Sequence, residues 1–115
     1  MSIQVEIPGQ KILTLTHLAL DLNGTIACDG ELLPGVVERI AALKEELAIT
    51  MLTADTRGKG AATAATLGIE LRRLTPGDEA AQKARFVQEI GAEHVVAVGN
   101  GANDAKMLRA AVLGI

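Results

Sequence analysis

The stretch that decides the fold is residues 12–25, ILTLTHLALDLNGT. Its first part, from Ile12 to Leu20, is rich in aliphatic and β-branched residues without clean polar alternation, which is typical of a strand covered on both faces of a sheet. The strand then ends at Asp21 and enters a loop that contains Gly24. We therefore predict a central strand that delivers a carboxylate to a glycine loop. An Asp at a strand end can also cap a loop without any further role, so a functional role for Asp21 needs support from other motifs.

The apolar segments on either side alternate between strand length and helical spacing. Such alternation predicts parallel strands joined by right-handed crossovers, with helices on both faces of the sheet. The predicted fold class is α/β, a Rossmann-like three-layer α/β/α sandwich with a mostly parallel sheet. The further predicted strands are 3–7 (an N-terminal edge strand), 49–52, 69–71, 94–98 and 112–115, and the predicted helices are 34–47, 61–67, 78–90 and 103–110.

Length and composition limit the classes of function. With 115 residues, 49% of them hydrophobic, the chain can form one compact domain over residues 1–115. A net charge of -3 without a dense Lys/Arg cluster disfavours nucleic acid and anionic membranes as partners. No secretory signal or membrane-spanning run is present, and the lone Cys28 cannot close an intrachain disulfide. A cytoplasmic location is therefore expected.

Two other predicted strand ends carry oxygen-bearing side chains. Thr53, with its hydroxyl, follows the strand 49–52, and the sequence GNGAND at 99–104 follows the strand 94–98. The carboxyl ends of parallel strands meet at one edge of the sheet, so these groups should converge with Asp21. Lys83 lies on a predicted helix between polar neighbours, and taken alone it would be a solvated surface charge.

Together, DLNGT at 21–25, Thr53, Lys83 and GNGANDAKML at 99–108 resemble the four motifs of the haloacid dehalogenase superfamily of phosphohydrolases. Within it, the chain is similar to soluble relatives of the P-type ATPase phosphorylation domain. The resemblance implies a magnesium-dependent enzyme in which Asp21 attacks phosphorus and forms an aspartyl-phosphate. It further implies three sets of site residues: catalytic Asp21, Asn23, Thr53 and Lys83; metal-binding Asp21, Asn23, Asn100 and Asp104; phosphate-binding Gly24, Thr25, Thr53, Ala54, Lys83 and Asn103.

Two positions depart from the family pattern. Asn23 stands where phosphatases of the superfamily carry a second Asp that acts as acid and base, and a positioned acid/base contributes about 10²–10⁴-fold to rate. We therefore expect slow turnover. Asn100 replaces an acidic ligand with a neutral oxygen, which should weaken magnesium binding. The alternative is a non-catalytic or regulatory domain of the same fold that binds phosphate or magnesium.

The spacing between the motifs leaves no room for the inserted cap domain of many relatives, so we expect an open site, with at most a small flap at 26–33. The substrate is expected to be a small-molecule or macromolecular phosphate ester that the sequence does not identify. The last apolar run reaches Ile115 without a covering helix, which favours a homo-oligomer.

Overall fold

The structure, a computed structural model, describes residues 2–6, 8, 12–21, 27–28, 31–54, 58–99 and 104–115. Five parallel strands form its main sheet, in the order β7-β6-β3-β8-β9. The strand β3 lies at the centre, as the sequence predicted. The sheet strands are β3 (His17–Asp21), β6 (Ala48–Thr53), β7 (Glu70–Arg73), β8 (Val95–Val98) and β9 (Leu113–Gly114).

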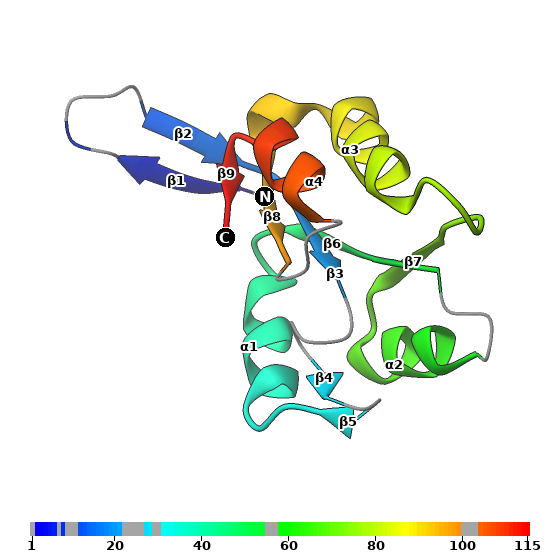
Figure 1. The fold of residues 1–115 in the computed structure, drawn as a ribbon. Helices are drawn as coiled ribbons and strands as arrows, with labels where there is room; N and C mark the ends of the chain where they lie inside the picture. The colour runs from blue at the N-terminus through cyan, green and yellow to red at the C-terminus, as the bar shows by residue number, and fades with distance from the viewer. Residues whose placement is uncertain are drawn as a thin grey trace.

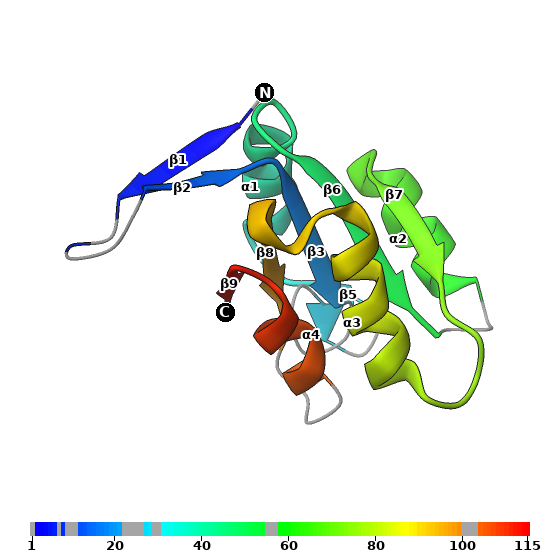
Figure 2. The ribbon, with the colours of Figure 1, turned by 90° about the horizontal axis from the view of Figure 1, so that it is seen from above.

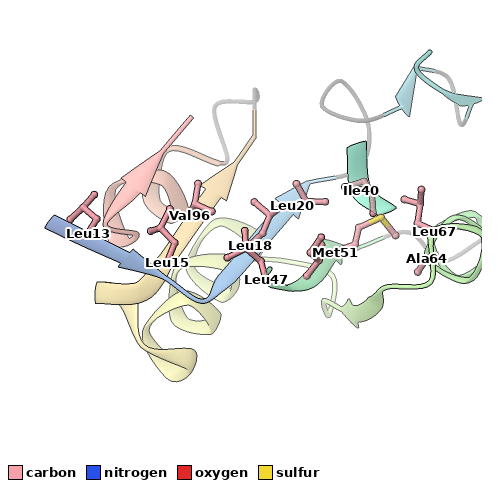
Figure 3. Close-up of a cluster of buried hydrophobic side chains, with 11 residues drawn as sticks. Leu13, Leu15, Leu18, Leu20, Ile40, Leu47, Met51, Ala64, Leu67 and Val96 are labelled. Carbon is pink, nitrogen blue, oxygen red and sulfur yellow. The ribbon is translucent and has the colours of Figure 1, made fainter. Parts of the chain in front are cut away.

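Two helices cover each face of this sheet (Figure 1, Figure 2). Alternate residues along β3 show why: Leu18 and Leu20 face a core cluster that includes residues of α1 and α2, whereas Ala19 faces a second cluster with α3 and α4. Figure 3 shows the first cluster as it extends from β2 across β3 to α2. The predicted three-layer α/β/α class is confirmed. The helices are α1 (Val36–Leu43), α2 (Lys59–Leu67), α3 (Glu79–Ile90) and α4 (Ala105–Ala110).

The predicted single strand 12–20 is wrong in one respect, because it is two strands. The strand β2 (Ile12–Leu15) leaves the main sheet and pairs antiparallel with β1 (Ile3–Glu6), and this separate hairpin projects from the body (Figure 1). Along β2, Leu13 and Leu15 are buried while Ile12 is exposed. That alternation is the pattern of a strand with one buried face, which the predicted continuous strand did not take into account.

Smaller differences concern element ends. The helix α1 ends at Leu43 and turns before β6, short of the predicted end at 47. A 3-10 turn, Ala92–His94, precedes β8. The predicted flap at 26–33 contains the short antiparallel pair β4 (Ala27–Cys28) and β5 (Glu31–Leu32), and no cap domain is present among the described residues. In the part of the chain that the structure describes, no helix is long and apolar enough to cross a membrane.

Candidate active site

The carboxyl ends of β3 and β6 lie side by side, and they place two predicted site residues at one edge of the sheet. Asp21 is the last residue of β3 and pairs in register with Leu52 of β6. Thr53 therefore lies one residue further along the neighbouring strand. Its side chain is buried, and its backbone carbonyl accepts a hydrogen bond from the Leu74 N–H at 2.8 Å. Strand β8 reaches the same edge on the other side of β3.

Lys83 of α3 joins two carboxylates at this edge. Its Nζ atom donates to Oδ1 of Asp104 at 2.6 Å and to Oδ1 of Asp21 at 3.1 Å. The side chains of Lys83 and Asp104 are 5% and 0% exposed, whereas that of Asp21 is 19% exposed. The interpretation of Lys83 as a solvated surface charge is therefore wrong. Among these three groups, Asp21 is the one that a ligand from solvent can reach most easily.

The electrostatics of this cluster favour the charged form of Lys83. Burial of the ammonium by itself lowers its pKa, but the hydrogen bond to Asp104 and the negative charge of Asp21 more than offset that effect. The net result is a pKa raised above the ordinary value of 10.5. Lys83 is thus a permanent cation at neutral pH, fixed between two carboxylates.

Gly99 makes space for the buried carboxylate of Asp104. It follows β8 directly, and a Cβ atom added to it would lie 2.7 Å from Cγ of Asp104. Any side chain there would push Asp104 away from its contact with Lys83. Sequence reasoning singled out Gly24 as a site residue and missed this role of Gly99. The only signal was its position between the strand end and the following polar motif.

The structure brings Asp21, Lys83 and Asp104 into contact and places Thr53 at the adjoining strand end. Ala54, the next residue, is half-buried. The other residues predicted for the site lie outside the described part of the chain: Asn23, Gly24, Thr25, Asn100 and Asn103.

The oxygen atoms of this cluster suit a hard cation. Asp21 and Asp104 are both within hydrogen-bonding distance of one ammonium, so their carboxylates are close neighbours. Magnesium prefers oxygen ligands in an octahedral shell and keeps several waters, so one or two carboxylates are enough from the protein. Among the described residues, no three His, Cys, Asp or Glu side chains gather as a metal site. The two carboxylates could therefore hold magnesium only together with water, phosphate or the predicted ligands Asn23 and Asn100.

Comparison with known proteins identifies relatives of two kinds. A family model described as haloacid dehalogenase-like hydrolase matches residues 2–111. The cation-transporting ATPase G of Mycobacterium tuberculosis is 43% identical over 98 residues, which are 82% of this chain and 12% of the ATPase. The copper-transporting ATPase PacS of Synechocystis is 35% identical over 107 residues, 89% of this chain and 14% of that protein. The chain thus spans a small part of the length of these relatives.

Solved structures share the fold at low sequence identity. A HAD family hydrolase from Streptomyces avermitilis superimposes with a TM-score of 0.70 at 22% identity, covering 87% of this chain and 65% of its own. The cobalt-bound deoxy-D-mannose-octulosonate 8-phosphate phosphatase of Haemophilus influenzae gives 0.69 at 15% identity, with 87% and 67% covered. A phospho-aspartyl intermediate analogue of phosphoserine phosphatase gives 0.58 at 24% identity, with 70% and 49% covered.

Proposed function

Because the chain belongs to the haloacid dehalogenase-like hydrolases, we propose that it is a magnesium-dependent phosphohydrolase or phosphotransferase that acts through an aspartyl-phosphate on Asp21. The observation that carries the proposal is the contact of Lys83 with both Asp21 and Asp104. An ion pair with one carboxylate would be ordinary, but a buried lysine shared by two carboxylates at the carboxyl edge of a parallel sheet is typical of a site built for anion chemistry.

In the proposed reaction, a carboxylate oxygen of Asp21 forms a bond to phosphorus while the bond from phosphorus to the leaving oxygen breaks. Water then attacks the aspartyl-phosphate, which releases inorganic phosphate and restores the carboxylate. Lys83 offsets the negative charge that gathers when a phosphate approaches Asp21, and the Thr53 hydroxyl would donate a hydrogen bond to a phosphoryl oxygen. Gly24, Thr25, Ala54 and Asn103 would complete the phosphate pocket.

Magnesium would be held by Asp21 and Asp104, with the Asn23 carbonyl and Asn100 as further ligands. When bound, it would withdraw negative charge from the phosphoryl oxygens. The cobalt-bound phosphatase of the same fold supports a divalent cation in this role. Asp104 can serve as a ligand only while Gly99 leaves room for its carboxylate.

The proposal includes slow turnover, because Asn23 cannot exchange a proton with the leaving group or with water. An aspartyl-phosphate formed in such a site should decay slowly. The same substitution favours a second candidate function, a regulatory domain that binds phosphate and magnesium without efficient hydrolysis. The contacts within the Asp21, Lys83 and Asp104 cluster favour the enzyme, since a binding domain does not need a nucleophile beside a buried cation.

Beryllium fluoride separates these two functions, because as a mimic of phosphoaspartate it needs both the carboxylate of Asp21 and magnesium. We expect saturable binding by the wild-type chain in magnesium, measured by calorimetry, and none after Asp21→Asn or in the presence of a chelator. The matched control is Asp78→Asn, a substitution in the loop before α3 that should leave binding unchanged. Absence of binding by the wild-type chain would favour the regulatory domain.

A further inference from the structure

The loop 74–78 joins β7 to α3, and the side chain of Gln82 binds this loop to the first turn of the helix. The amide oxygen of Gln82 accepts hydrogen bonds from the Thr75 N–H at 3.0 Å and from the Thr75 hydroxyl at 3.1 Å. The amide nitrogen donates to the carbonyls of Thr75 at 2.9 Å and Gly77 at 2.7 Å. One side chain thus binds four polar groups of the loop.

These bonds matter because the start of α3 lacks the usual cap. Gly77 and Asp78 lead into the helix with φ angles of 89° and 54°, in the left-handed region. Asp78 directly precedes the helix, but its side chain makes no capping hydrogen bond to the first turn. The first N–H groups of a helix have no partner within the helix, and helix ends fray. Gln82 therefore replaces a capping residue as the group that fixes where α3 begins.

The loop 74–78 connects two parts of the candidate active site. At its start, the Leu74 N–H donates to the carbonyl of Thr53 at the carboxyl end of β6, at 2.8 Å. After its end, α3 carries Lys83, the residue next to Gln82, and the ammonium of Lys83 contacts Asp21 at 3.1 Å. In Figure 2, β3 and β6 point toward the end of the molecule at which α3 begins.

Lys83 lies between two supports of α3. One turn further along the helix, Phe86 and Val87 are buried in the core cluster between the sheet, α3 and α4, and these apolar contacts hold the body of the helix. On the other side, the hydrogen bonds of Gln82 hold the first turn. A frayed or shifted first turn would move the backbone of Lys83, and with it the distance from its ammonium to the carboxylate of Asp21.

We propose that Gln82 is a positioning residue: by binding the loop 74–78 to the first turn of α3, it holds the ammonium of Lys83 at Asp21. This inference rests on the proposed function. Among the described residues the side chain of Gln82 binds only this loop, so it acts on the reaction through Lys83. A cation stabilises the charge that develops during phosphoryl transfer only while it is held at the reacting atoms.

The test measures how fast acetyl phosphate phosphorylates Asp21 of the full chain in magnesium, by acid quench and mass spectrometry. Gln82→Leu removes the hydrogen bonds to the loop at similar volume. We expect the rate to fall about tenfold, since misplacing a catalytic group by about 1 Å costs up to about 10²-fold. Gln82→Glu keeps the acceptor for Thr75 but cannot donate to the carbonyls, so its rate should be intermediate. The matched control is Gln88→Leu, the same substitution at an exposed position of α3, which should leave the rate unchanged.

A double-mutant cycle separates positioning from a purely structural role. If Gln82 acts through Lys83, Gln82→Leu should not slow phosphorylation further in Lys83→Met, whereas a structural defect would slow both backgrounds equally. Should Gln82→Leu fail to fold, the same comparison is made with Gln82→Glu. An unchanged rate in the Gln82 variants, or the same fold loss with and without Lys83, would overturn the inference alone. A wild-type chain that is never phosphorylated on Asp21 would overturn the proposed function as well, so the two failures can be told apart.

Discussion

The buried ammonium of Lys83 contacts two carboxylates, and its removal should lower the stability of the folded chain. In Lys83→Met the carboxylates of Asp21 and Asp104 would repel each other without a cation between them. We expect a loss of about 3 kcal/mol in the free energy of unfolding, measured by urea denaturation without magnesium. Added magnesium should stabilise this variant more than the wild type, because a second cation can then separate the carboxylates.

The control for this prediction is Lys106→Met, which removes an exposed lysine of α4 and should change stability by less than about 0.5 kcal/mol. Equal stabilities of the wild type and Lys83→Met would mean that the contacts of Lys83 with Asp21 and Asp104 contribute nothing to the free energy of unfolding.

The stabilisation by Lys83 should also depend on pH in a defined direction. Its pKa in the folded chain is raised above 10.5, the ordinary value, so protonation of Lys83 favours the folded state. Its contribution should be complete below pH 10.5 and disappear as the pH rises through the folded pKa. The measurement is urea denaturation of the wild type and of Lys83→Met at a series of pH values. The difference between their free energies of unfolding should become smaller only above pH 10.5. A difference that vanishes near neutral pH would contradict it.

Gly99 should be intolerant of even one methyl group. Its added Cβ would overlap the Asp104 carboxylate, and such overpacking costs typically about 1–3 kcal/mol. Gly99→Ala should therefore lower both stability and magnesium affinity. A double-mutant cycle with Asp104→Ala identifies the cause, because the penalty of Gly99→Ala should shrink once the carboxylate is absent. If Gly99→Ala lowered stability equally in the wild type and in Asp104→Ala, the added methyl group would overlap some group other than the Asp104 carboxylate.

At the scale of elements, the last residue of α2 accepts a hydrogen bond from the residue that directly follows α1. Lys44 donates from Nζ to the Leu67 carbonyl at 3.0 Å, and Gly68 ends the helix at a φ of 68°. Gly68→Ala should cost about 1 kcal/mol in thermal or urea unfolding, because a side chain in that conformation crowds its own carbonyl. Its Cβ would also lie 2.7 Å from the Lys44 Nζ. The penalty should be smaller in a Lys44→Met background, and a stabilising Gly68→Ala would contradict this account.

The elements also show where sequence patterns are sufficient. Helical spacing and a C-terminal glycine predicted α2 and α3 to within about two residues at each end. The break between β2 and β3 was not predicted, because nine residues of which eight are aliphatic or β-branched fit one strand as well as two. The division depends on tertiary structure: the Thr16 backbone bonds to His94 and Ala48, where β3 joins its two neighbours.

At the scale of the whole molecule, the order of the motifs was enough to predict that Asp21, Thr53 and Asp104 lie at one edge of the sheet. The burial of Lys83 and the role of Gly99 were not predictable, because both depend on how closely α3 and α4 approach the strands.

An apolar hollow of about 370 Å³ lies on the face of the sheet opposite to α3 and α4, and it is lined by residues that include Leu15, Ile40, Val98 and Leu113. The homo-oligomer stays a prediction, as do the cytoplasmic location and the single domain.

The measurement that tests the central claim most directly is detection of the phosphorylated residue. The chain would be incubated with magnesium and acetyl phosphate, quenched in acid, digested and analysed by mass spectrometry. The account predicts one phosphoryl group on Asp21, removed by hydroxylamine, reduced in Lys83→Met and absent in Asp21→Asn. Hydrolysis of phosphate esters that persists in Asp21→Asn, or a phosphoryl group on a different residue, would contradict it.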